Sequence, residues 1–152
     1  MPAALAAQRL LAEEWDVAAD VWSAPGWVQL HREGIDCDVW NRFHPDQEPR
    51  MPWFTEVLRD AEGPVVAVTD FQKAVPGLIA PWVPGCYATL GTDGFGRSDT
   101  RPALRRLFRV DAPSVVVAAL SELAVACDVK PDTVTKAIQR YDLGPDAVVE
   151  RR

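Results

Sequence analysis

The sequence has few of the residues that carry most metal and redox chemistry in proteins. It contains two histidines and three cysteines among 152 residues. Cys37, Cys86 and Cys127 are widely spaced and form no CxxC pair, which argues against both a disulfide framework and a zinc site. His31 and His44 have no second ligand at metal-binding spacing. We therefore expect reduced thiols and no metal ligated by this chain.

Long hydrophobic runs and an excess of basic residues are also missing. No apolar stretch approaches the length that spans a membrane, and Arg9, Glu13 and Glu14 interrupt any signal-peptide core near the N-terminus. Sixteen Lys and Arg against 22 Asp and Glu give a net charge of −6, which argues against general nucleic-acid binding. We therefore expect a cytoplasmic protein without membrane or nucleic-acid partners.

The composition that remains is that of one globular domain, with 48% apolar and 25% charged residues. All six tryptophans lie in the first 82 residues. They fit an aromatic core, but some of them, with Trp22 and Trp27 as candidates, also fit a subunit interface, where tryptophan is enriched. The sequence leaves both interpretations open.

Helical spacing and short apolar runs alternate along the chain. They predict helices at residues 3–14, 27–43 (with a break near Gly34), 54–58, 101–108, 112–126 and from 131, a broken helix at 72–83, and strands at 18–22, 64–69 and 86–90. This order predicts an α/β fold, a three-layer α/β/α domain with a mainly parallel sheet. We expect the domain at residues 1–143 and a loose tail at 144–152.

A glycine-rich loop follows the strand at 86–90, with Gly91, Gly94 and Gly96 before the next helix. Glycine tolerates positive φ at little cost, so the loop is predicted to be tightly specified. It fits a structural turn, a contact with a partner, or a small-anion site at the helix N-terminus. The motif is neither a Walker loop nor a dinucleotide fingerprint, and Asp93 would repel a phosphate.

Asp70 ends the preceding strand, and the carboxyl ends of parallel strands meet at one edge of a sheet, where ligands gather. We therefore expect Asp70 and the glycine-rich loop to share that edge. No nucleophile–base pair accompanies them, so the catalytic set is incomplete. The candidate site, facing a partner or an active site, comprises Asp70, Asp93, Gly94, Phe95, Gly96, Arg97, Ser98 and Asp99.

Five arginines fall between residues 97 and 109 of this acidic chain. Arg101, Arg105 and Arg109 recur every fourth residue and would share one helical face. That face is either a solvated helix side or a surface that docks on carboxylates of another subunit, because the planar guanidinium pairs bidentately with carboxylates.

Residues 90–108, LGTDGFGRSDTRPALRRLF, followed by VDAPSVVVAAL, resemble the C-terminal part of homodimeric-type pyruvate dehydrogenase E1 components. These enzymes depend on thiamine diphosphate and belong to the transketolase superfamily. Three further segments carry the same resemblance in the same order: AAQRLLAEEWDVAADVWSAPGW, WNRFHPDQEPRMPWF and GPVVAVTDFQKAVPGLIAPWVPG. The similarity thus extends over nearly the whole chain.

The resemblance implies a transketolase C-terminal-like fold with three layers and a five-stranded mixed sheet. In the family, thiamine diphosphate and magnesium bind between the two preceding domains, and the C-terminal domain is mainly architectural. We therefore expect no catalytic, cofactor-binding or metal-binding residue in this chain alone. The expected partner is a chain that carries the thiamine-diphosphate-binding domains, within an oligomer.

The chain departs from the family in two ways. It holds only the last domain, so alone it should not decarboxylate pyruvate. The family's domain also opens with a strand before the helix at residues 3–14, so the sheet would lack this first strand unless another polypeptide supplies it. The chain is then a subunit of a split enzyme that decarboxylates a 2-oxo acid and transfers the acyl group or forms acyloins, a non-enzymatic interaction module, or a fragment of a full E1 enzyme.

Overall fold

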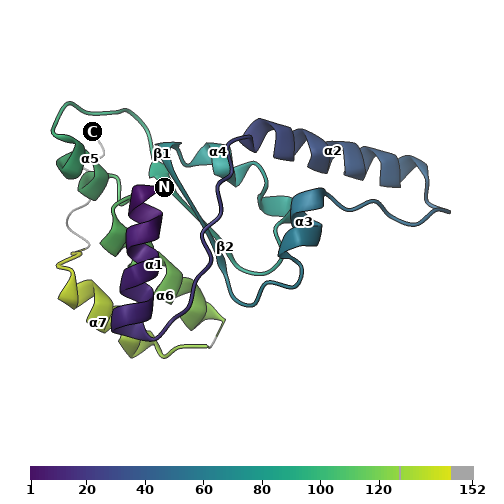
Figure 1. Ribbon diagram of the computed structural model, residues 1–152. Helices are drawn as coiled ribbons and strands as arrows, with labels where there is room; N and C mark the ends of the chain where they lie inside the picture. Colours follow the sequence, from purple (N-terminus) through teal and green to yellow (C-terminus); the bar gives the residue numbers. More distant parts are fainter. Residues whose placement is uncertain (127, 145–152) are drawn as a thin grey trace.

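Helices and strands alternate along most of the chain (Figure 1). The computed structural model describes residues 1–126 and 128–144. In chain order the elements are α1 (Pro2–Trp15), α2 (Trp27–Phe43), α3 (Trp53–Leu58), β1 (Val65–Gln72), α4 (Ala74–Gly77), the 3₁₀ helix η1 (Ala80–Trp82), β2 (Tyr87–Thr92), α5 (Arg101–Leu107), α6 (Ala112–Val125) and α7 (Pro131–Arg140). The predicted helices are all present. Apart from Gly144, the tail predicted to be loose lies outside the described residues.

The two strands form a parallel sheet, joined by a crossover through α4 and η1. Val65 pairs with Tyr87 and Val68 with Leu90, and the register then shifts so that Gln72 pairs with Thr92. The strands predicted at residues 64–69 and 86–90 are therefore confirmed, and so is the α/β class.

The strand predicted at residues 18–22 is not formed. The backbone of residues 17–22 makes no sheet ladder with any described residue. Burial nevertheless alternates along it: the side chains at 17, 19 and 21 are half-buried and those at 18, 20 and 22 are exposed. The prediction from a short apolar run is therefore wrong, because a strand also needs a hydrogen-bonded neighbour. The described sheet has two strands, fewer than the five that the family resemblance implies.

Helices pack on both faces of this small sheet. A first cluster contains buried residues of α1, α6 and α7, and Val68 and Leu90 of the strands pack against it. A second cluster joins α3, η1 and the start of α2, and Val65 and Tyr87 pack against that one. Successive strand side chains point to opposite faces, so residues three apart lie on opposite sides of the sheet. The three-layer arrangement is confirmed.

The first cluster is the better buried of the two. Val116 and Leu120 on α6 are fully buried, with α1 and α7 packed against α6. This agrees with a helix that is apolar nearly all round. Asp111 caps α6 as predicted, because its Oδ1 accepts a hydrogen bond from the Ser114 amide at 3.2 Å.

Hydrogen bonds and an ion pair connect the end of α1 to the end of α7. The Trp15 indole donates to the Tyr141 hydroxyl at 2.9 Å, and that hydroxyl donates to Glu14 at 2.7 Å. Arg140 also pairs with Glu14 at 2.7 Å. The hydrogen bond from Tyr141, followed by Arg140, holds the pKa of Glu14 below its usual value.

Helix α2 extends away from the sheet and is continuous through Gly34, so the predicted break is wrong (Figure 1). Gly34 instead allows the ring of Trp82 to lie close to the backbone of α2. A Cβ at this position would lie 2.6 Å from the ring of Trp82, which donates a hydrogen bond from its indole nitrogen to Asp38 at 3.1 Å. Glycine therefore allows α2 to rest on η1.

Both tyrosines of the chain should resist ionisation. Burial raises the pKa of Tyr87 to about 12, and its hydroxyl donates to the Pro76 carbonyl at 2.8 Å. Burial also raises the pKa of Tyr141. Because the unfolded side chain ionises near pH 10, stability from Tyr87 is complete below pH 10 and is lost as pH approaches about 12.

An absorbance titration of tyrosinate tests this. Tyr87 of the folded chain should form little tyrosinate at pH 10, whereas the urea-unfolded chain should be half titrated there. Tyr141→Phe leaves Tyr87 as the only reporter. Half-titration of that folded variant near pH 10 would contradict the burial of this hydroxyl.

Candidate functional site

The carboxyl ends of β1 and β2 form the edge at which the candidate site was predicted. Asp70 lies near the end of β1, and Asp93 directly follows β2. Lys73, just beyond β1, joins the two strand ends: its amide donates to the Thr92 carbonyl at 3.0 Å, and its Nζ pairs with Asp93 at 2.5 Å. The structure thus brings Asp70 and Asp93 to one edge.

Gly91 allows the strand ends to approach closely. A Cβ on Gly91 would lie 2.8 Å from the Phe71 carbonyl oxygen and from the Lys73 amide nitrogen, beside the part of β1 where the register shifts. Its φ is not in the left-handed region. The sequence identified Gly91 as special but for a different reason, since a β-bulge in the neighbouring strand leaves no local signal.

The loop after β2 is exposed throughout, from Asp93 to Thr100. Gly94 has φ +86°, as expected for a tight turn, whereas Gly96 has open space around it and no positive φ. The prediction that several glycines serve positive φ is therefore right only for Gly94 within this loop. Phe95 is 97% exposed, so the loop presents an aromatic ring to solvent.

A shallow pocket of about 310 Å³ opens between the strand ends and α4. Its lining residues are Gln72, Lys73, Ala74, Gly77, Thr89, Thr92, Asp93 and Gly94. The ammonium group of Lys73 is already matched by the Asp93 carboxylate, so the pocket has no excess positive charge. The predicted site residues Arg97, Ser98 and Asp99 do not line it.

This pocket does not fit thiamine diphosphate with magnesium. A diphosphate needs cations or free backbone amides, and magnesium needs oxygen ligands that are not already engaged by a cation. Here Asp93 is held by Lys73, and Arg105 lies 3.5 Å from Asp70. Among residues 1–126 and 128–144, no group of three or more His, Cys, Asp and Glu is arranged to hold a metal.

The helical face predicted to carry Arg101, Arg105 and Arg109 is interrupted, because α5 ends at Leu107. Arg105 pairs with Asp70, and Arg106 pairs with Asp111 at 3.2 Å. Arg109 lies beyond the helix with φ 56°, so the predicted stacking of Arg105 and Arg109 on one helical face is wrong. Arg101, at the start of the helix, is exposed.

The two candidate interface tryptophans differ in environment. Trp22 is 63% exposed and follows the extended residues 17–21, whereas Trp27 packs beside the second hydrophobic cluster. Trp27 therefore has a structural role, and Trp22 presents the more accessible ring.

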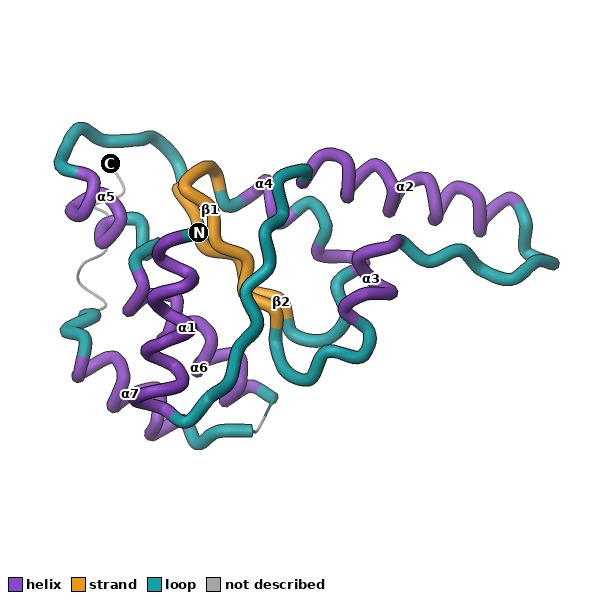
Figure 2. Tube along the Cα trace, viewed as in Figure 1, coloured by secondary structure: helices purple, strands orange, loops and turns teal. Residues whose placement is uncertain are grey.

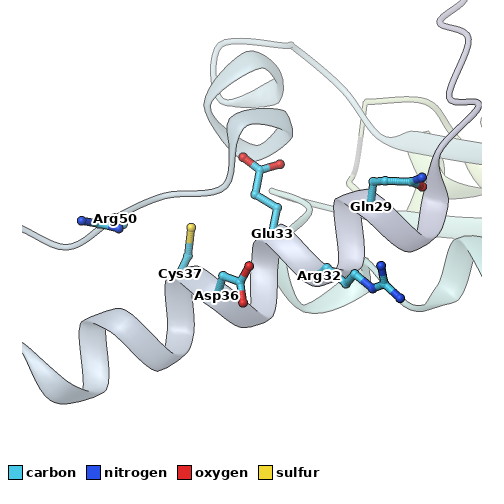
Figure 3. Close-up of a pocket in the computed structure, with 6 residues that line it drawn as sticks. All are labelled: Gln29, Arg32, Glu33, Asp36, Cys37 and Arg50. Atoms are coloured by element: carbon cyan, nitrogen blue, oxygen red, sulfur yellow. The ribbon is translucent and has the colours of Figure 1, made fainter.

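A second pocket, of about 410 Å³, lies along α2 and was not predicted. It is lined by Gln29, Arg32, Glu33, Asp36, Cys37 and Arg50 (Figure 3). Figure 3 shows the Cys37 sulfur pointing from α2 toward the segment that carries Arg50. Burial raises the pKa of this thiol, so it stays protonated and unreactive at neutral pH. Cys37 and Cys86 are free thiols, and Cys127 lies outside the described residues.

No helix in the described part of the chain combines the length and apolar character needed to cross a bilayer.

The site geometry is that of a neutral, solvent-facing sheet edge with an aromatic loop beside it. The exposed aromatic ring of that loop lies beside two carboxylates that are each paired with a cation.

Comparison with known proteins agrees with the observed fold. The family model for the transketolase-like C-terminal domain matches residues 1–111. The pyruvate dehydrogenase E1 component of Mycobacterium tuberculosis is 52% identical over 141 residues, which is 93% of this chain and 15% of that protein. The E1 component of Escherichia coli K12 is 43% identical over 146 residues, 95% of this chain and 16% of that protein.

The chain therefore spans about one sixth of the length of the curated relatives that it matches, and it does so along nearly its entire sequence. The family match covers 111 of 152 residues, and the parallel sheet lies between helical layers. This chain belongs to the family of transketolase-like C-terminal domains.

Proposed function

We propose that this chain is the C-terminal component of a thiamine-diphosphate-dependent, pyruvate dehydrogenase E1-like enzyme. The supporting observation is identity of 52% and 43% to E1 components across nearly the whole chain. The assembled enzyme would decarboxylate a 2-oxo acid and transfer the acyl group, to lipoamide or to another carbonyl. The remaining part of that enzyme would hold the cofactor and magnesium.

The contribution of this chain is assembly and shielding of the active site. The sheet edge presents two uncovered aromatic rings, with Phe71 65% and Phe95 97% exposed. Aromatic side chains that become buried in an interface contribute much of its binding energy. The exposed loop that carries Phe95 is therefore the segment proposed to meet the cofactor-binding part of the enzyme, within an oligomer.

Complementation tests the proposal. The M. tuberculosis E1 component, with the region matching this chain deleted, is mixed with the full chain, thiamine diphosphate and Mg²⁺. Pyruvate-dependent reduction of ferricyanide is measured. We expect the truncated relative alone to be nearly inactive and turnover to rise at least about tenfold on mixing, with both proteins eluting together. Turnover that is unchanged by this chain would contradict the proposal.

A matched pair of variants locates the contact. Phe95→Ala in the loop should weaken complementation about tenfold, the size of a central aromatic contact. Phe43→Ala is the control, because Phe43 is 74% exposed but lies at the far end of α2. Equal effects of both variants would argue against the loop as the contact.

A second candidate function is a non-enzymatic interaction module. It is favoured by the outer side of α2, where Val28, Ile35, Val39 and Phe43 are all more than 40% exposed. In that case Phe43→Ala would weaken binding to the truncated relative, Phe95→Ala would not, and turnover would stay unchanged.

A further inference from the structure

The charge of α5 and the loop before it is opposite in sign to that of the whole protein. Residues 97–109 contain five arginines and one aspartate, a net charge of +4, whereas the chain as a whole carries −6. In Figures 1 and 2 the loop and α5 lie at the opposite side of the molecule from α2. The basic charge is therefore concentrated at one end of the domain, which also carries the exposed ring of Phe95.

Two of the five arginines connect α5 to the rest of the domain. Arg105 pairs with Asp70 near the end of β1. Arg106 pairs with Asp111 at the start of α6 and donates a hydrogen bond to the Tyr141 carbonyl at 3.4 Å. These two guanidinium groups therefore already have partners within the chain.

The other three arginines have no such role. Arg97, Arg101 and Arg109 are exposed, and with the described residues their side chains form no ion pair. Like charges at helical spacing, such as Arg101 and Arg105, repel one another. The isolated domain therefore gains no stability from gathering these side chains at one end.

The backbone at Arg109 is a second, independent observation. Its φ is 56°, in the left-handed region that suits glycine and is uncommon for a long side chain. The other described non-glycine residues with positive φ are Asp16 and Asp142, and aspartate tolerates this region better. An arginine thus stands just after α5 where glycine would be relaxed, which is typical of a side chain retained for binding.

We propose that Arg97, Arg101 and Arg109 bind carboxylates on the surface that receives the Phe95 loop, in the cofactor-binding part of the enzyme. This inference rests on the proposed function and gives the chemistry of its partner surface. A guanidinium group pairs with a carboxylate through two parallel hydrogen bonds, which fix orientation as well as charge. The partner surface is then acidic around an apolar socket for the ring of Phe95.

The charge distribution favours a folded protein surface over a nucleic acid or an anionic membrane. The basic area is confined to the loop and α5, and the remainder of the chain is acidic. A long polyanion or a flat anionic membrane would extend past the three arginines and meet like charge. Carboxylates placed locally on a folded partner match the arginines without that repulsion.

Binding to the M. tuberculosis E1 component that lacks the region matching this chain tests the proposal. Biolayer interferometry gives the association rate and the Kd from about 50 to about 500 mM NaCl. For the full chain we expect binding to weaken as salt rises. The combined variant Arg97→Glu, Arg101→Glu and Arg109→Glu should bind at least about tenfold more weakly at low salt, mainly through slower association.

A matched triple variant changes the net charge by the same amount elsewhere. Arg9→Glu, Arg32→Glu and Arg42→Glu alter exposed arginines of α1 and α2 that also have no ion pair with a described residue. This control should bind within about threefold of the unaltered chain. Equal or greater weakening by the control, or binding that does not depend on salt, would overturn the proposal.

Arg109→Gly separates the side chain from the backbone conformation. Glycine adopts this φ without strain, so the variant should keep a Tm at least as high as that of the unaltered chain while it binds more weakly. A lower Tm with unchanged binding would assign Arg109 to the fold and overturn its part in the proposal.

A short duplex DNA and vesicles that contain phosphatidylserine test the competing partners. Binding to either that is tighter than to the truncated relative, and is lost in the variant at Arg97, Arg101 and Arg109, would overturn the assignment to carboxylates. The measurements involve no turnover. Complementation that succeeds while the charge variants bind normally would overturn this inference alone, whereas the absence of any binding would overturn the proposed function as well.

Discussion

Replacing Gly91 with alanine should lower the free energy of unfolding by about 3 kcal/mol and disturb the sheet edge. The added Cβ would lie 2.8 Å from two main-chain atoms of β1 and its extension, the Phe71 oxygen and the Lys73 nitrogen. Backbone atoms in a paired sheet cannot move aside as a flexible side chain can. Overpacking of this kind typically costs about 1–3 kcal/mol, and a clash with backbone belongs at the upper end.

Gly96→Ala is the matched control for this prediction. It makes the same chemical change five residues later, with nothing within 4 Å of the new Cβ and no positive φ. Urea unfolding should therefore show a large loss for Gly91→Ala and a change within about 0.5 kcal/mol for Gly96→Ala. Similar stability of the two variants would mean that the strand ends are not held this close.

Leu120→Ala should destabilise the protein by about 2–5 kcal/mol, the range for a fully buried leucine. Leu120 has no exposed surface and lies in the cluster with Leu11 of α1 and Ala137 of α7. Truncation would leave a cavity where three helices meet. Because small domains are stable by only about 5–15 kcal/mol, the loss would remove a large share of the total.

Val125→Ala provides the control on the same helix. Its side chain is 68% exposed, so truncation removes little buried surface. Thermal unfolding should show a clearly lower Tm for Leu120→Ala and little change for Val125→Ala. A small effect at Leu120 would mean that the helices can close around the missing side chain.

Local patterns were sufficient to predict most of the fold. The run at residues 64–69 predicted β1 because its β-branched residues lack alternation, and Asp111 followed by Pro113 marked the start of α6. These signals act within a few residues of chain. The edge shared by Asp70 and Asp93 was also predictable, because it follows from the direction of parallel strands.

Contacts between distant segments were not predictable in this way. The break expected at Gly34 reflected an intrinsic helix propensity, but the ring of Trp82, 48 positions later, explains why the helix keeps a glycine there. The strand expected at residues 18–22 from its apolar run has no described neighbour, so no ladder forms there. A sequence pattern reports which side chains are buried, but it does not report which backbone lies beside them.

The candidate site, too, was predictable where it depends on local patterns and not where it depends on contacts between distant segments. The sequence identified the glycine-rich loop and Asp70, but the ion pair between Lys73 and Asp93 decides the charge of the pocket, and Lys73 was not singled out. The pocket beside Cys37 was missed because its lining comes from α2 and from Arg50 in a later segment. Both depend on tertiary proximity, for which the chain offers no periodic signal.

The paired strands carry side chains that pack against both hydrophobic clusters. Val65 and Tyr87 belong to one side, and Val68 and Leu90 to the other. Cooperative unfolding requires that the loss of one region weakens the other, and here a short ladder carries that coupling. A change that weakens this ladder would therefore let the side formed by α2 and α3 unfold separately from α1, α6 and α7.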